Sequence, residues 1–192
     1  MPELLPRAAD RFTGIVRAIE PADFGAPTPC ADYDVRALLR HLLYWGPFLL
    51  AAARRTEAPA PAGGEVALDL GEDWADRLDR QAADLTEALL RPGAGDGMTD
   101  FGGNPLPASM LYAMVYDEFV IHGWDLATAT GRPFDLETEI ATDLYELLVP
   151  TADMAREMKV YGPEVPVPAS APILDRLLGL TGRDPSWTPP VR

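Results

Sequence analysis

The residues with the clearest capacity for chemistry are the only two histidines of the 192-residue chain, His41 and His122, and a glutamate, Glu118. Glu118 precedes His122 by four positions, so on an α-helix their side chains share one face, with Cβ atoms roughly 5–6 Å apart. That separation allows both side chains to reach one metal ion. Three ligands of the imidazole and carboxylate type leave a coordination position open, as catalytic zinc sites do. The three residues are therefore candidate ligands of one metal ion.

The sequence around these residues predicts that they point inward. Around Glu118 and His122, the positions at helical spacing are mostly apolar: Leu111, Val115, Leu126 and Ala129, with Asp125 beside them. Around His41 they are Ala37, Leu38, Trp45 and Phe48. A carboxylate that faces a core needs a partner, because an unpaired buried charge is very costly. A metal ion is one such partner, and facing helices of a bundle are a common place for such a site.

Two interpretations need no metal. An E-x3-H pair on a helix can be a hydrogen bond that satisfies a buried histidine, and His41 alone can be a core histidine. In that case the three residues simply satisfy one another. Asp125, three positions after His122, can accept a hydrogen bond from the ring N–H of a ligand histidine, as outer carboxylates of metal sites do. A purely structural hydrogen bond or salt bridge is the alternative for Asp125.

Helical periodicity and stop signals define the elements that would position these residues. Helices are expected at about Pro2–Ile19, Val35–Arg55, Gly71–Leu90, Pro107–Thr130, Leu136–Lys159 and Ala171–Leu180. Asp34 is a suitable N-cap for the second helix, and Gly131-Arg132-Pro133 ends the fourth. The glycine-rich residues 92–107 are expected to form a loop, which can include a short extended piece.

Long helices with short connections, and almost no alternation with a period of two, predict an all-α helical bundle. The length fits one domain over residues 1–192, with a bundle core at about 1–131 and a C-terminal helical extension at about 135–192. For a metal site, the second and fourth helices must face each other.

Composition excludes several classes of function. The net charge is −14, and a protein that binds nucleic acid or an anionic membrane needs a basic footprint. The longest apolar stretch is too short to span a bilayer. The first residues lack the basic and apolar regions of a signal peptide. A single cysteine, Cys30, excludes an internal disulfide and suits a reducing compartment. We therefore expect a cytoplasmic protein with a small-molecule ligand; a homodimer is the default oligomer.

Two runs carry a family resemblance. TPCADYDVRALLRHL at residues 28–42 and HGWDLATATGRP at residues 122–133 resemble the mycothiol-dependent maleylpyruvate isomerase N-terminal domain, which belongs to the DinB/YfiT-like superfamily of metalloenzymes. The carboxyl end, residues 162–169, 175–178 and 182–187, looks like that of an actinobacterial subgroup. The resemblance thus covers nearly the whole chain.

The resemblance implies a DinB-like four-helix bundle with additional C-terminal helices and a divalent metal, usually zinc. In the family the metal is held by a histidine on the second helix and an E-x3-H pair on the fourth, positions that His41, Glu118 and His122 match. Arg77 and Arg80 are weak candidates for binding the thiol cofactor. The favoured interpretation for both is the solvent-facing side of an amphipathic helix.

The resemblance also implies a function. We expect a metal-dependent enzyme that uses mycothiol or a similar low-molecular-weight thiol, as an S-transferase or as an isomerase, on a small electrophilic substrate. A metal-bound thiol loses its proton readily, and both reactions need the same ligand set. The alternative is a non-catalytic binding or regulatory module on the same fold. A fourth protein ligand, with Asp125 as the candidate, would favour that alternative.

Overall fold

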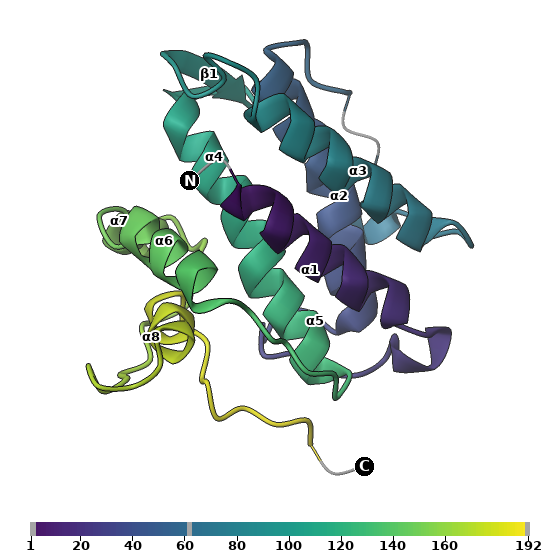
Figure 1. The fold of residues 1–192 in the computed structure, drawn as a ribbon. Helices are drawn as coiled ribbons and strands as arrows, with labels where there is room; N and C mark the ends of the chain where they lie inside the picture. The colour runs from purple at the N-terminus through teal and green to yellow at the C-terminus, as the bar shows by residue number, and fades with distance from the viewer. Residues whose placement is uncertain (1–2, 61–62, 191–192) are drawn as a thin grey trace.

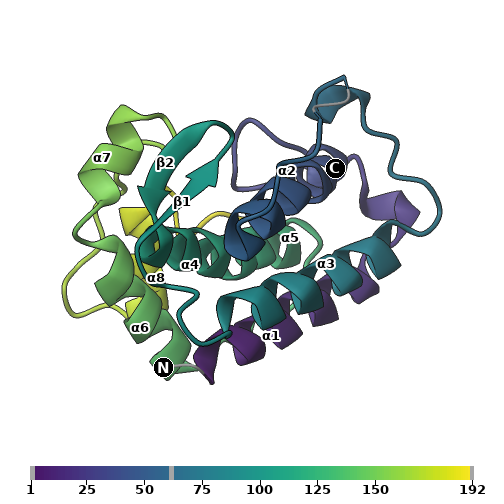
Figure 2. The same ribbon diagram turned by 90° about the horizontal axis from the view of Figure 1, so that it is seen from above.

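The computed structural model describes residues 3–60 and 63–190 and is predominantly helical (Figures 1 and 2). Its helices are α1 (Leu4–Ala18), α2 (Val35–Arg54), α3 (Trp74–Leu89), α4 (Ala108–Asp117), α5 (Gly123–Ala129), α6 (Thr138–Leu148), α7 (Ala152–Glu157) and α8 (Ile173–Leu180). The all-α prediction is confirmed, in a form consistent with a DinB-like bundle. Pro2, the predicted start of the first helix, lies outside the described residues.

Four helical rods form the bundle: α1, α2, α3 and the rod that begins with α4 and ends with α5. α1 packs against α3 and α5, and α2 packs against α3 and α4. The apolar face of α3 is buried, at Trp74, Leu78, Leu85 and Leu89. Each fully buried leucine contributes roughly 1.5–3 kcal/mol relative to an exposed one. The second and fourth rods therefore meet inside one core.

Helix α2 begins and continues as its sequence predicts. The Asp34 carboxylate accepts a hydrogen bond from the Ala37 backbone N–H at 2.7 Å, which satisfies a free donor of the first turn. The helix continues through Pro47 and ends at Arg55, which has a left-handed conformation with φ +53°. Gln81 from α3 donates its side-chain N–H to the carbonyl of Leu42 at 2.8 Å, which ties the two helices together near His41.

The fourth rod contains a local change of helical pitch. Between α4 and α5, residues Glu118–His122 form a π-helical segment, and the rod continues without a break. The predicted stripe of Leu111, Val115, Asp125 and Leu126 is buried. Glu118 and His122 are the first and last residues of the π-helical segment, a type of distortion that is frequent at functional sites.

One sequence-based expectation for the elements is made more specific by the structure, and another is wrong. The predicted loop at 92–107 contains a hairpin of β1 (Met98–Phe101) and β2 (Asn104–Pro107). Its turn residues, Gly102 and Gly103, both have positive φ, as a type I′ turn requires. The predicted helix Leu136–Lys159 is divided into α6 and α7 near Pro150, a residue that has no backbone N–H for the helical hydrogen-bond ladder.

The C-terminal extension packs on the bundle. α6 contacts α4, α1 and α8, and buried residues of α6 and α8 belong to the same apolar cluster as the bundle core. The proline-rich crossing after Gly162 pairs with α8, since the Val165 N–H donates to the Gly179 carbonyl at 3.0 Å. In Figure 1 the yellow segment after α8 runs past the lower end of α5. None of the described helices combines the length and apolar character needed to cross a membrane.

Candidate metal centre

The three predicted ligands meet between α2 and the π-helical segment. One ligand atom each from His41, Glu118 and His122 lies within 4.8 Å of the others. Glu118 Oε2 lies 3.8 Å from His41 Nε2 and 3.7 Å from His122 Nε2. A tetrahedral zinc ion with bonds of about 2.0–2.1 Å would separate its ligand atoms by roughly 3.3 Å. The two glutamate–histidine distances exceed this separation by about 0.5 Å or less.

The far side of the His122 ring is held by Asp125. Asp125 Oδ2 lies 3.0 Å from His122 Nδ1, and its side chain is fully buried. The same carboxylate accepts a hydrogen bond from Arg183 at 3.0 Å. A ring N–H donated to a carboxylate fixes the tautomer and the orientation of a ligand histidine. This contact leaves Nε2 of His122 with its lone pair toward Glu118.

The His41 ring has a corresponding partner, Glu65. Glu65 belongs to a 3-10 turn, Glu65–Ala67, in the connection between α2 and α3. Its Oε2 lies 3.2 Å from His41 Nδ1 and accepts a hydrogen bond from the Trp45 indole N–H at 3.0 Å. Tyr33 Oη lies 3.1 Å from the same histidine nitrogen. Both histidines therefore direct Nε2 toward Glu118 and Nδ1 toward an acidic group.

Burial and neighbouring charges oppose each other in this cluster. Burial would raise the pKa of the Glu118 and Asp125 carboxyls, but the nearby histidines and Arg183 lower both pKa values below the ordinary range. Burial would lower the pKa of His41, but Glu118, followed by Glu65, raises it overall. The carboxylates therefore stay ionised, and the space between them and the two rings favours a positive charge.

The geometry favours a cation over mutual hydrogen bonding. The two Nε2–Oε2 distances exceed the 2.7–3.2 Å range of protein N–H···O hydrogen bonds. If each Nδ1 carries the ring proton, both Nε2 lone pairs face the Glu118 carboxylate, an arrangement that needs a cation between them. Glu65, Glu118 and Asp125 place three carboxyl groups around the two rings, and Arg183 is paired with Asp125. The donor set thus fits a divalent metal.

Solvent can reach the site, and Asp125 is engaged elsewhere. The side chains of His41, Glu118 and His122 are 17%, 25% and 13% exposed. The expected inward orientation of the His41 stripe is only partly right, because Trp45 and Phe48 are half-buried. Their rings contact each other, Phe48 also contacts Tyr44, and Trp45 also contacts Phe101. Asp125 contacts the outer nitrogen of His122 and Arg183, so its position is that of a supporting group and not of a fourth ligand.

The structure does not bring Arg77, Arg80 or Cys30 into the ligand set. Arg77 donates to the backbone carbonyl of Leu70 at 2.9 Å, and the exposed Arg80 lies 3.8 Å from Asp73. Both contacts stay near the start of α3. Cys30 is half-buried in the connection before α2, and burial raises the pKa of its thiol to about 11. That pKa keeps the thiol protonated and favours a structural role for Cys30.

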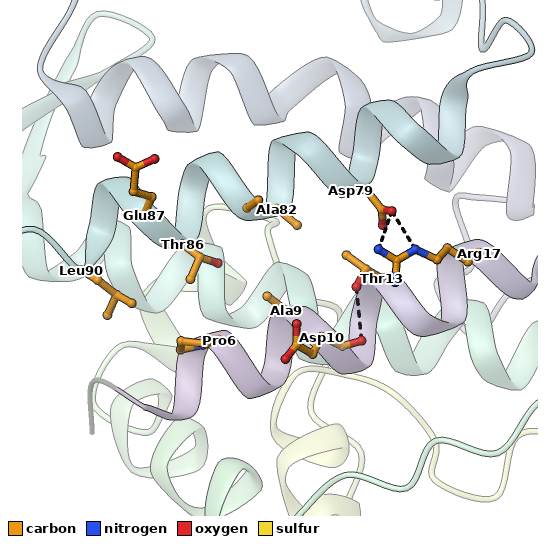
Figure 3. A pocket seen from close by; sticks show the side chains of 11 residues that line it. Pro6, Ala9, Asp10, Thr13, Arg17, Asp79, Ala82, Thr86, Glu87 and Leu90 are labelled. Atoms are coloured by element: carbon orange, nitrogen blue, oxygen red, sulfur yellow. Dashed lines mark hydrogen bonds and ion pairs between the residues drawn. The ribbon is translucent and has the colours of Figure 1, made fainter.

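A groove lies elsewhere, between α1 and α3 (Figure 3). Two of its charged side chains pair with each other, since Arg17 donates to Asp79 at 2.7 Å, and a third, Glu87, lies 3.5 Å from Arg91. The remaining lining is largely small or apolar, for example Pro6, Ala9 and Ala82. None of the three candidate ligands borders it. The groove is therefore a concave surface without converging polar groups that could bind a metal ion or catalyse a reaction.

Two functional candidates were missed by the sequence analysis, Glu65 and Arg183. Glu65 stands in a polar connection without helical periodicity, and Arg183 stands after the last helix. Neither position carries a local signal that relates it to a histidine far away in the chain. Only the tertiary fold places each of them beside the centre.

Comparison with known proteins agrees with this architecture. The family model described as mycothiol maleylpyruvate isomerase N-terminal domain matches residues 5–127, a range that includes all three candidate ligands. Two proteins of Mycobacterium tuberculosis, from strains CDC 1551 and H37Rv and both described as uncharacterised, are 26% identical over 188 residues. The alignments cover 92% of this chain and 94% of each relative. No solved structure matches the chain.

Proposed function

The chain belongs to the mycothiol maleylpyruvate isomerase N-terminal domain family, and we propose that it is a divalent-metal-dependent enzyme acting with a low-molecular-weight thiol such as mycothiol. Its substrate would be a small electrophile. The reaction would be the transfer of the thiol to that electrophile or a thiol-assisted isomerisation. Zinc is the metal that the ligand types favour.

One observation carries the proposal: two Nε2 atoms and one carboxylate oxygen converge, while each Nδ1 faces an acidic group. This is how histidine ligands are held at metal sites, where the outer hydrogen bond sets the tautomer. A hydrogen-bonded cluster without metal would have shorter Nε2–Oε2 distances than the observed 3.7 and 3.8 Å. Metal binding therefore explains the cluster better than hydrogen bonding among His41, Glu118 and His122 does.

Each residue has a distinct task in the proposed enzyme. His41, Glu118 and His122 would hold the metal, and Glu65 and Asp125 would orient the two rings. When bound, the metal supplies a Lewis-acid position that lowers the pKa of a thiol placed there. The partial exposure of the three ligands leaves a route for the thiol and the electrophile to reach that position.

The isomerisation and the transfer begin with the same step, the attack of the thiolate on the electrophile. A thiolate adds to an activated carbon–carbon double bond, so a C–S bond forms and the π electrons move to the neighbouring electron-poor group. In an isomerase the remaining single bond rotates, the C–S bond breaks and the double bond returns. In a transferase a proton from solvent completes the adduct, or a leaving group departs with its electron pair. The same ligand set serves both outcomes.

The test combines metal dependence with thiol dependence. The protein is stripped with a chelator, reloaded with zinc and assayed with mycothiol against activated alkenes and against electrophiles that carry a leaving group. We expect turnover that needs both zinc and thiol and that is lost in His122→Ala. An isomerised alkene identifies an isomerase, and an S-conjugate identifies a transferase. Stoichiometric zinc without any thiol-dependent reaction would overturn the enzyme proposal and favour the non-catalytic binding module.

A further inference from the structure

The buried ion pair between Asp125 and Arg183 connects the candidate metal centre to the C-terminal segment. Arg183 Nη2 donates to Asp125 Oδ2 at 3.0 Å, and the two side chains are 8% and 0% exposed. The same Oδ2 lies 3.0 Å from His122 Nδ1. One carboxylate oxygen therefore receives both the arginine and the histidine, so its position sets the orientation of the ring.

The backbone conformation after α8 places Arg183 next to Asp125. Gly182 has a φ of +83°, and a Cβ at that position would come within 2.9–3.0 Å of the Gly162 backbone. The backbone N–H of Arg183 donates to the Leu178 carbonyl at 2.8 Å, and Nη1 donates to the Thr181 carbonyl at 2.9 Å. These contacts hold the backbone and the guanidinium group of Arg183 in the position from which the side chain contacts Asp125.

The burial of both side chains gives the Asp125–Arg183 pair a structural consequence. A buried arginine without a partner is strongly disfavoured, and a buried ion pair is a weak source of net stability compared with apolar packing. Such a pair is well suited to holding a polar group in one orientation. Here the oriented group is the carboxylate that faces a candidate metal ligand.

We propose that Arg183 is a positioning residue of the candidate metal centre, which holds Asp125 so that Asp125 fixes the His122 ring with Nε2 toward Glu118. The proposal rests on the proposed metal-dependent function. It implies that a residue outside the matched range 5–127 completes a site whose ligands all lie inside it. The C-terminal extension would then be part of the functional unit.

The test measures metal binding directly and needs no substrate. Zn²⁺ dissociation constants are determined by competition with a chromophoric chelator for the wild type, Arg183→Met, Arg183→Lys and Arg156→Met. Co²⁺-loaded samples of each report ligand geometry through their visible absorption. Arg156 is the matched control, because it also ties α7 to the C-terminal segment, through the Leu180 carbonyl at 2.8 Å, and pairs with Asp153 and Glu164.

We expect Arg183→Met to weaken Zn²⁺ binding by about 10-fold, the lower end of the effect of removing outer partners of metal ligands. Its Co²⁺ spectrum should differ from that of the wild type. Arg183→Lys keeps a positive charge beside Asp125 and thus guards against misfolding. Its effect should be intermediate, because an ammonium group cannot bridge both carboxylate oxygens as a guanidinium does. Arg156→Met should match the wild type in both measurements.

The outcomes separate the two proposals. Folded Arg183→Met and Arg183→Lys with wild-type affinity and spectrum would overturn the positioning role while the metal centre stands. An equal loss in Arg156→Met would also overturn it, since any loosening of the C-terminal segment would then suffice. A wild-type protein that binds neither Zn²⁺ nor Co²⁺ would overturn the proposed function, and this inference with it.

Discussion

His122 and His41 each face an acidic group with the ring nitrogen that points away from Glu118, but the two acidic groups differ in burial and in their own partners. Asp125, beside His122, is fully buried and paired with Arg183. Glu65, beside His41, is 22% exposed and is held by the Trp45 indole N–H. The first comes from the same helical rod as its histidine, the second from a connection between helices.

The centre therefore has a fixed side, around His122 and Asp125, and a more accessible side, around His41 and Glu65. On the fixed side, Glu118, His122 and Asp125 follow one another along one helical rod, with Arg183 behind them. On the accessible side, the orientation of His41 depends on Glu65 and Tyr33, which lie outside the bundle helices. The His41 side therefore depends on a partly exposed supporting group, whereas the His122 side depends on a buried one.

The largest expected effect comes from breaking the fixed side. Asp125→Ala should weaken Zn²⁺ binding by about 100-fold, the upper end for outer partners of metal ligands. It should also reduce the free energy of unfolding by roughly 3–5 kcal/mol, because Arg183 loses its buried partner. Metal competition and denaturant unfolding measure the two effects. Wild-type stability in this variant would show that the Asp125–Arg183 pair is not buried in the native protein.

A smaller effect is expected when the accessible side is changed in the corresponding way. Glu65→Gln should weaken Zn²⁺ binding by about 10-fold through the loss of a charged acceptor for His41. Its cost in unfolding free energy should be at most about 1 kcal/mol, because partly exposed ion pairs contribute little. The same two measurements apply. A loss of affinity as large as that of Asp125→Ala would contradict the distinction between the two sides.

A still smaller effect is expected from removing the hydrogen bond that holds Glu65 on the His41 side. Trp45→Phe removes the indole N–H that donates to Glu65 at 3.0 Å but keeps an aromatic ring near Phe101. We expect a drop in Zn²⁺ affinity of about 2- to 5-fold, because the lost hydrogen bond to the Glu65 carboxylate acts on His41 only indirectly, through the position of Glu65. In a Glu65→Gln background the same substitution should add little, which a double-mutant cycle would measure.

The smallest effect is expected at the two arginines of α3. Arg77→Ala and Arg80→Ala should leave Zn²⁺ affinity and the thiol KM unchanged, because their contacts go to Leu70 and Asp73 and not to either side of the centre. Surface substitutions of this kind change the unfolding free energy by about 0.5 kcal/mol or less. A raised KM for the thiol in either variant would assign that arginine to cofactor binding after all.

The sequence predicted what depends on local pattern. Apolar spacing located α1, α2 and α3, and the Asp34 cap located the start of α2. The Gly102-Gly103 turn lies in the region that the sequence predicts as a loop with a short extended piece. The break at Pro150 was not predicted, because helical periodicity continues on both sides of it. The π-helical segment had none, because Glu118 and His122 fit ordinary helical spacing equally well.

The supporting groups of the centre could not be predicted, for a physical reason. Glu65 and Arg183 reach the histidines across long stretches of chain, from segments without periodicity. They orient the histidines only because the tertiary fold packs Arg183 against Asp125 and Glu65 against Trp45. Residue type and spacing identify candidate ligands, whereas the groups that orient ligands become visible only with the fold.

The central claim is that His41, Glu118 and His122 form a metal centre, and metal content tests it most directly. Elemental mass spectrometry is applied to the purified wild type, to Glu118→Ala and to the control Glu87→Ala, whose glutamate is an exposed residue of α3 paired with Arg91. We expect one zinc or similar divalent ion per chain in the wild type and the control, and its loss in Glu118→Ala. A wild-type protein that holds no metal after incubation with zinc would show that the three residues do not form a metal centre.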